Sequence, residues 1–236
     1  MKFYPAFIRI ENRKCVVVGG GRVAERKTVK LLAAGADVTV ISPDLTPRLA
    51  ALRDSGKLRH LGRPYRDGDL DGAFLVIAAT SDTALNVRAA QSSPCLVNAA
   101  DMPRLCNFIV PSTIQRGDLR IAVSTSGASP SAARTIRLEL EKLYTSDTGR
   151  YLKFLQGLRE KTLASALGRR QRAEFFKEAG SVTALKTLRE KGFKSIRDEL
   201  DARFRRLSAS AQGAKSGAKS VLSPGAKKIK KIKGDA

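Results

Sequence analysis

Cysteine is scarce in this sequence of 236 residues, which contains only three cysteines. Their number is odd, no CxxC pair occurs, and Cys15 and Cys95 lie in or beside apolar stretches. Disulfide frameworks use paired cysteines, and metal clusters need closely spaced ligands. We therefore expect reduced, mostly buried thiols and no metal site.

Long apolar runs and additional histidines are also missing. No apolar stretch approaches the roughly 20 residues that a membrane-spanning helix needs. The N-terminal residues lead into a strand instead of the apolar core of a signal peptide. These absences predict a cytoplasmic protein without a membrane span. The one histidine, His60, lies in an alternating stretch near the predicted sheet edge, so we expect a structural or exposed role for it.

Acidic residues are few relative to basic ones. The chain has 44 Lys and Arg against 22 Asp and Glu, a formal net charge of +22. Residues 1–150 contain 22 basic and 14 acidic side chains, whereas residues 151–236 contain 22 and 8, so the excess lies mainly in the C-terminal third. Such a field attracts nucleic acid, an anionic membrane or a small polyanion, and charge alone does not choose among them.

The most informative stretch joins an apolar strand to a helix through glycines. Residues 15–18 form a continuous apolar run, typical of a parallel strand covered on both faces. From Gly19 the spacing is Gly-x-Gly-x-x-Ala. Gly19 permits a tight turn, Gly21 lets a pyrophosphate approach the backbone, and Ala24 permits close packing of the helix. The free N–H groups of that helix would hold the phosphates, although a purely structural turn would show the same glycines.

The next residues complete a βαβ unit, with a helix over residues 23–34 and a strand over residues 37–41. In nicotinamide-binding units, a carboxylate near the end of the second strand often binds the adenosine ribose. Ser42 stands at that position here, and Asp44 follows two residues later. Either residue can instead cap the next helix, which has Pro47 in its first turn, and the two roles are compatible.

Three more strands are predicted, over residues 57–61, 73–79 and 95–100, with helices over residues 45–54 and 83–92. In the usual doubly wound order the first, fourth and fifth strands are neighbours, so their carboxyl ends meet at one crevice. A dinucleotide bound there would have its nicotinamide near Thr80 and Asp101. Hydride transfer from a substrate to the nicotinamide needs a proton acceptor at this place. Asp101 is therefore the candidate base. Its alternative role is support of the turn at Met102-Pro103.

The pattern changes after residue 111. A strand is predicted over residues 119–124, and Ser129 with Pro130 opens a helix that ends near Tyr144. Between them, the hydroxyls of Thr125 and Ser126 can bind a carboxylate or phosphate at the helix start, or serve only as a cap.

Helices follow near residues 150–166, 169–179, 181–191 and 195–207. The tail from Ser208, rich in Ala, Ser, Gly and Lys, is predicted to be disordered.

Six motifs occur together in a fixed order over roughly residues 3–145. They are Tyr4-Pro-Ala-Phe7, Val18-Gly-Gly-Gly-Arg-Val-Ala-Glu-Arg-Lys27, Ile77-Ala-Ala-Thr-Ser-Asp82, Asn98-Ala-Ala-Asp101, Phe108-Ile-Val-Pro-Ser112 and Ser124-Thr-Ser-Gly-Ala-Ser-Pro130. As a set they resemble one family, the siroheme synthase N-terminal module, also known as precorrin-2 dehydrogenase and sometimes active as a sirohydrochlorin ferrochelatase.

The resemblance implies an NAD-dependent oxidation of precorrin-2 to sirohydrochlorin by a homodimer, with ferrochelatase activity left open. It also implies an α/β fold: a Rossmann-like doubly wound parallel sheet, a small α+β dimerisation domain and a helical C-terminal domain. We place these at residues 1–113, 114–147 and 148–207, with a basic tail over residues 208–236.

Individual roles are carried over by motif. Asp101 matches the catalytic aspartate, and Thr125 and Ser126 match a substrate loop. The cofactor contacts that the motifs imply are Gly19, Gly21, Arg22, Val23, Pro43 and Asp44. Thr125 stands where serine is common, and Ala128 departs from the usual Gly-Gly pair.

A competing hypothesis is an NAD(H)-sensing regulator that binds nucleic acid through the basic C-terminal third. It would use the same glycine loop but would leave Asp101 without a role. No helix-turn-helix with a convincing recognition helix is visible in the sequence, so specific nucleic-acid binding is not expected.

Overall fold

A computed structural model describes residues 3–220 of the chain, with side chains described up to residue 213. Two compact units are present. The first comprises the chain up to Pro111 together with Ser124–Ser131, and the second comprises Ser112–Val123 together with the chain from Ala132 onward.

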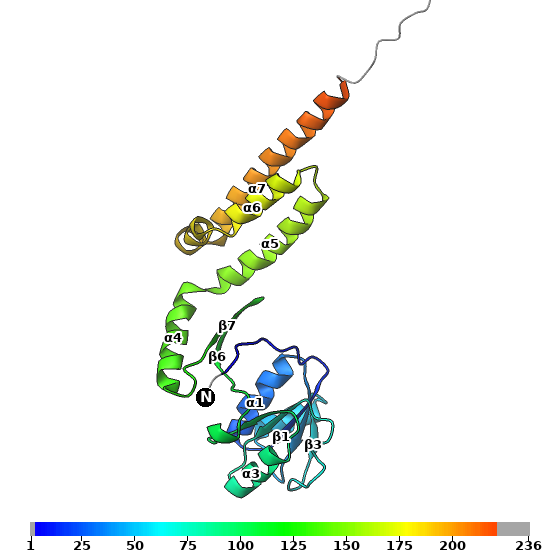
Figure 1. The fold of residues 1–236 in the computed structure, drawn as a ribbon, viewed down its shortest axis with the longest axis vertical. Coiled ribbons are helices and arrows are strands. Elements are labelled where there is room, and N and C mark those ends of the chain that lie inside the picture. The colour runs from blue at the N-terminus through cyan, green and yellow to red at the C-terminus, as the bar shows by residue number, and fades with distance from the viewer. Residues whose placement is uncertain (1–2, 221–236) are drawn as a thin grey trace, which may run out of the picture. The chain divides into compact units, whose positions relative to one another are not determined.

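The first unit contains a five-stranded parallel sheet in the order β3-β2-β1-β4-β5. Strands β1 and β3 of this sheet are labelled in Figure 1. The strands are β1 (Lys14–Val18), β2 (Asp37–Ile41), β3 (Arg59–Leu61), β4 (Leu75–Ala78) and β5 (Leu96–Ala99). The helices are α1 (Arg22–Ala33), α2 (Pro47–Asp54) and α3 (Thr83–Gln91), followed by a short 3-10 turn over Pro103–Leu105. The predicted doubly wound order is confirmed, since the first, fourth and fifth strands are neighbours.

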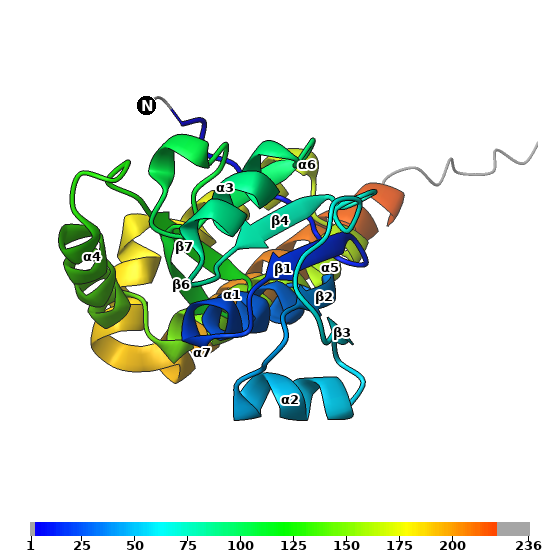
Figure 2. The same cartoon turned by 90° about the horizontal axis from the view of Figure 1, so that it is seen from below.

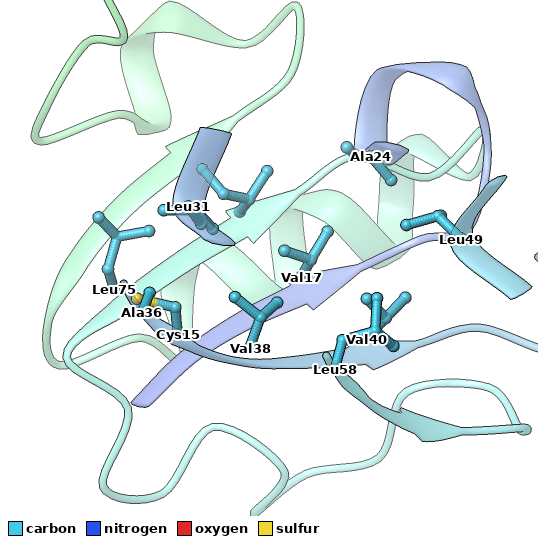
Figure 3. Close-up of a cluster of buried hydrophobic side chains, with 12 residues drawn as sticks. Cys15, Val17, Ala24, Leu31, Ala36, Val38, Val40, Leu49, Leu58 and Leu75 are labelled. Carbon is cyan, nitrogen blue, oxygen red and sulfur yellow. The ribbon is translucent and has the colours of Figure 1, made fainter. Parts of the chain in front are cut away.

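Burial on both faces explains the uninterrupted apolar sequence of β1. Val17 belongs to a buried cluster that includes Leu31 of α1 (Figure 3). Val16 belongs to a second cluster that includes Ala89 of α3. Figure 2 shows α1 and α3 on opposite sides of the sheet. Neither face of the central strand therefore has room for a polar side chain.

The three cysteines are free, as predicted. Cys15 is fully buried in β1, and burial raises the pKa of its thiol to about 11. The Cys95 pKa is raised as well, again mainly by burial. Both thiols therefore stay protonated at neutral pH, which is the state expected of structural cysteines.

The cap of α2 differs from the expected one. Neither Ser42 nor Asp44 caps this helix; the Thr46 side chain accepts a hydrogen bond from the Leu49 N–H at 3.3 Å. Thr46 directly precedes Pro47, the first helical residue, and is therefore in the N-cap position. Ser42 and Asp44 consequently lie in the loop before the helix.

The second unit begins with an antiparallel hairpin of β6 (Ser112–Arg116) and β7 (Leu119–Val123). Strand β7 was predicted and β6 was not. The turn contains Gly117 in a left-handed conformation, with φ of 58°. The helix α4 (Pro130–Leu143) then begins at the predicted proline.

Three further helices follow: α5 (Ser146–Ala164), α6 (Arg169–Ala179) and α7 (Val182–Ser220). Helix α7 is interrupted at Gly192, where φ is 79° and ψ is 172°. The expected break between the last two helices is thus a single residue. Contrary to the predicted disorder from Ser208, helix α7 continues to Ser220. The rest of that tail, residues 221–236, lies outside the described residues.

Aromatic and aliphatic side chains from α5, α6 and α7 form the core of the second unit. Tyr151, Phe175 and Ile196 are each almost fully buried in it, and the Tyr151 hydroxyl donates a hydrogen bond to the Ala179 carbonyl. At the interruption of α7, the Phe193 N–H donates to the Asp147 carboxylate at 3.3 Å. Over the described residues, no helix combines the length and apolar character needed to cross a membrane.

Two glycines of α5 provide a matched test of this packing. A Cβ added at Gly149 would lie 2.8 Å from the Arg116 carbonyl carbon and oxygen, whereas one added at Gly157 would meet nothing within 4 Å. We expect Gly149→Ala to lower the free energy of unfolding by roughly 1–3 kcal/mol, because the hairpin turn must move. Gly157→Ala should raise it by up to about 1 kcal/mol through helix propensity. Urea denaturation followed by circular dichroism measures both, and equal effects would contradict the close contact.

Candidate functional site

A cavity of about 600 Å³ opens at the carboxyl ends of β1, β2 and β4. Its walls come from the loops at residues 19–21, 42–46 and 79–82, with Pro64 and Tyr65 contributing from a fourth segment. The carboxyl edge of a parallel sheet, at the point where strand order reverses, is the usual ligand site of doubly wound folds. The first unit therefore has a ligand-sized opening at the predicted edge.

The glycine loop after β1 is fixed by close backbone contacts. Gly19 has φ of 119°, and a Cβ there would lie 2.4 Å from the Ala79 carbonyl oxygen. A Cβ at Gly20 would lie 1.9 Å from the Asp44 carbonyl oxygen. At Gly21 an added Cβ would meet nothing within 4 Å. Gly19 and Gly20 thus lie against neighbouring loops, and Gly21 faces open space.

The role of Gly20 was missed in the sequence, because the spacing rule treats this position as variable. The rule concerns the turn and the approach of a phosphate. It carries no information about which backbone segment of the next loop packs against the glycines.

Hydrogen bonds tie the loop after β2 to its neighbours. The Thr46 N–H donates to the Gly20 carbonyl at 3.0 Å, and the Thr46 hydroxyl donates to the Glu25 carboxylate at 2.6 Å. His60 Nε2 lies 2.8 Å from the Ser42 carbonyl oxygen. His60 therefore holds the end of β2, in keeping with a structural role, and Asp44 remains exposed in a braced loop.

Asn86 of α3 holds the loop after β4. Its Oδ1 accepts from the Thr80 N–H at 3.0 Å, and its Nδ2 donates to the Thr80 carbonyl at 3.0 Å. The Thr80 hydroxyl lies 2.9 Å from both Asn86 Oδ1 and the Asp82 carbonyl oxygen. Asn86 is buried, and no sequence pattern singled it out. The backbone of Thr80 is therefore held at the cavity by a partner six residues later.

Asp101 lies two residues after the end of β5. The Ala100 N–H donates to the Ala78 carbonyl at 2.8 Å, which extends the pairing of β4 and β5 to this point. Asp101 is exposed and has φ of 60°. A left-handed backbone at a residue other than glycine is uncommon and occurs preferentially at functional positions.

The predicted site residues fall into two groups. Those that line the cavity are Gly19, Gly21, Pro43, Asp44 and Thr80. Those outside its lining are Arg22, Val23, Asp101, Thr125 and Ser126. Arg22 and Val23 open α1 directly after Gly21.

The loop that contains Thr125 and Ser126 is held by its own side chains. The Thr125 hydroxyl accepts from the Ser129 N–H at 3.1 Å, and the Ser126 N–H donates to the Ser124 hydroxyl at 3.0 Å. Ser126, like Asp101, has a left-handed backbone, with φ of 53°. The hydroxyl hydrogen bonds and the left-handed residue therefore occur in the same turn.

Among the described residues, no group of three or more His, Cys, Asp and Glu side chains is arranged to hold a metal ion.

Comparison with known proteins agrees with this geometry. Residues 6–112 match a family model described as NAD(P)-binding, and residues 116–143 match one described as the central part of sirohaem biosynthesis proteins. The siroheme synthase of Thioalkalivibrio sulfidiphilus is 43% identical over 190 residues, which cover 78% of this chain and 39% of that protein. The chain is therefore similar to siroheme synthases over its NAD(P)-binding and central parts.

Two further relatives define the extent of the likeness. The siroheme synthase of Methylobacillus flagellatus is 45% identical over 163 residues, covering 68% of this chain and 35% of that protein. A solved structure titled SirC, precorrin-2 dehydrogenase, has a TM-score of 0.72 at 26% identity and covers 85% of this chain and 100% of its own. The chain thus spans less than half the length of the curated siroheme synthases that it matches.

Substitutions at Gly20 and Gly21 separate the packing of this loop against its neighbour from the space it leaves for a ligand. Gly20→Ala should lower the free energy of unfolding by roughly 1–3 kcal/mol, because the loop that contains Asp44 must move. Gly21→Ala should change it by less than about 1 kcal/mol, since its φ of −81° suits alanine. The Gly21 variant should nevertheless bind NADH roughly tenfold more weakly, because its methyl group occupies the space that a pyrophosphate would enter.

Urea unfolding and calorimetric titration with NADH measure the two effects. If Gly21→Ala bound NADH as tightly as the wild-type protein, the assignment of this loop to the cofactor would be contradicted.

Proposed function

We propose that this chain catalyses the NAD-dependent dehydrogenation of precorrin-2 to sirohydrochlorin. The proposal rests on what lies at the carboxyl edge of the parallel sheet in a chain similar to siroheme synthases. There, a glycine-lined cavity lies at the ends of β1, β2 and β4, and Asp101 follows the neighbouring strand in a strained backbone conformation. A dehydrogenase needs both a nucleotide site and a proton acceptor at such an edge.

The residues of the cavity fit a nicotinamide dinucleotide. Gly21 leaves open space at the start of α1, where the first N–H groups of the helix have no partners within the helix. The positive end of the helix dipole and the Arg22 guanidinium favour a pyrophosphate at this point. Pro43 and Asp44 line the cavity where the adenosine ribose would lie, and Thr80 lines it on the side of β4.

In this mechanism the bound cofactor supplies the hydride acceptor. The chain contributes Asp101, whose carboxylate accepts the proton that the substrate loses as its ring system is oxidised. Asp101 is exposed and therefore accessible to a substrate.

The substrate loop is assigned to Thr125 and Ser126, on the basis of the hydroxyl-bearing turn and the left-handed Ser126. Precorrin-2 is a polycarboxylate, and the formal net charge of +22 favours its encounter with the chain.

Replacement of Asp101 tests the assignment of the base. Asparagine is the suitable substitute because it tolerates a left-handed backbone, whereas alanine would add strain. With precorrin-2 and NAD under anaerobic conditions, we expect wild-type protein to produce NADH, and Asp101→Asn to lower kcat by roughly a hundredfold or more. The affinity for NADH should change by less than about twofold, since Asp101 does not line the cavity.

Asp118→Asn serves as the control, because Asp118 is an exposed carboxylate in the hairpin turn of the second unit. Full turnover by Asp101→Asn would remove Asp101 from the mechanism.

We further propose that NAD is preferred over NADP. A carboxylate at the Asp44 position accepts hydrogen bonds from the ribose hydroxyls and repels a 2′-phosphate. Asp44→Ala should therefore reduce the ratio of kcat/KM for NAD to that for NADP by roughly tenfold or more. Asp54→Ala, at the far end of α2, is the matched control. An unchanged ratio in Asp44→Ala would show that another residue discriminates between the cofactors.

A homodimer is also part of the proposal. Ile136, Leu138 and Leu143 of α4 are apolar side chains with exposed fractions of 42%, 36% and 47%. Apolar side chains gathered on one helix are typical of a surface that is covered in an assembly.

Iron insertion into sirohydrochlorin and the cytoplasmic location both stay predictions.

A further inference from the structure

Lys27 of α1 reaches across to the last strand of the sheet. Its ammonium group donates a hydrogen bond to Asn98 Oδ1 at 2.8 Å. Asn98 is buried, and its Nδ2 donates to the Phe108 carbonyl at 3.2 Å, so the amide is held in one orientation. The ammonium of Lys27 is therefore fixed beside the segment that leads to Asp101.

The ammonium of Lys27 has unused hydrogen-bonding capacity. It carries three N–H donors, and Asn98 Oδ1 is its one hydrogen-bond acceptor among the described residues. Burial lowers the pKa of Lys27, and the neighbouring Arg26 and Lys30 lower it further, whereas Cys106 and Asp101 act in the opposite direction. An incoming anion would accept the remaining hydrogen bonds and stabilise the charged form.

The position of Lys27 favours an anion of the substrate over one of the cofactor. Lys27 and Asn98 are absent from the lining of the cavity, where the phosphates of a dinucleotide would bind. Lys27 instead donates to Asn98, three residues before Asp101 in the chain, and the charge of Asp101 acts to raise the Lys27 pKa. A ligand that contacts both Lys27 and Asp101 would be a substrate. Its anionic substituent would lie close to the carbon that reacts.

We propose that Lys27 is a substrate-binding residue whose ammonium group holds one carboxylate of the tetrapyrrole and thereby orients the reacting ring toward Asp101. This inference rests on the proposed dehydrogenase function and adds a residue that determines how the substrate is held. The alternative is a purely structural Lys27 that links α1 to β5 and contacts no ligand.

Two substitutions separate these roles. Lys27→Gln keeps an N–H donor for Asn98 but removes the charge, and Lys27→Met removes both. If Lys27 holds a carboxylate, both variants should raise the KM for precorrin-2 by roughly tenfold or more, while kcat changes only severalfold. The KM for NAD should stay within about twofold of the wild-type value. Lys27→Arg keeps the charge and should restore most of the substrate affinity.

Lys30→Met is the matched control, because Lys30 is an exposed lysine on the same helix and its loss changes the net charge equally. If Lys27→Gln had the same KM for precorrin-2 as the wild-type protein, the inference would be overturned. A rise confined to the KM for NAD would also overturn it, because Lys27 would then serve a cofactor phosphate.

Binding of sirohydrochlorin, followed through its absorbance without turnover, separates this inference from the proposed function. Weaker binding by Lys27→Gln, with Lys30→Met unchanged, supports the inference even if the wild-type protein makes no NADH. Unchanged binding by Lys27→Gln overturns the inference even if the wild-type protein is fully active. An inactive wild-type protein would reject the dehydrogenase assignment alone.

Discussion

The backbone contact between Gly20 and the Asp44 carbonyl is the constraint on which the rest of the first unit depends. With Gly19 against Ala79, it brings the loops after β1, β2 and β4 together without intervening side chains. Because backbone lies directly on backbone, the loops cannot separate without losing the hydrogen bond from Thr46 to Gly20. The cavity is therefore formed by the fold itself, and a ligand need not order it.

The sheet could be predicted from the sequence, because its signals are local. The apolar run of β1 is buried on both faces, and β2 has the predicted bounds Asp37–Ile41. Strand β6 was missed, since Ile114 is its one buried side chain and gives no apolar pattern. The start of the tail was misplaced because composition was given more weight than continuity with the preceding helix, which extends to Ser220.

The candidate site was predictable only in part, for a different reason. The glycine loop could be located because it follows β1 directly, and Asp101 was singled out because it comes shortly after β5, although its catalytic role stays a prediction. Thr46 was missed as the cap because Ser42 and Asp44 offered earlier polar candidates. Asn86 could not be found, because its importance lies in hydrogen bonds to the backbone of Thr80. Residue types reveal what a side chain can do, and only coordinates reveal what it contacts.

The hydrogen bond between Lys27 and Asn98 also bears on how the first unit is assembled. It joins residues 71 positions apart in the sequence, so it forms only once the final strand has docked. Closing so long a loop costs chain entropy before any contact compensates for it. In a partly folded chain the ammonium group stays hydrated. Its partial dehydration therefore takes place only when β5 docks beside α1.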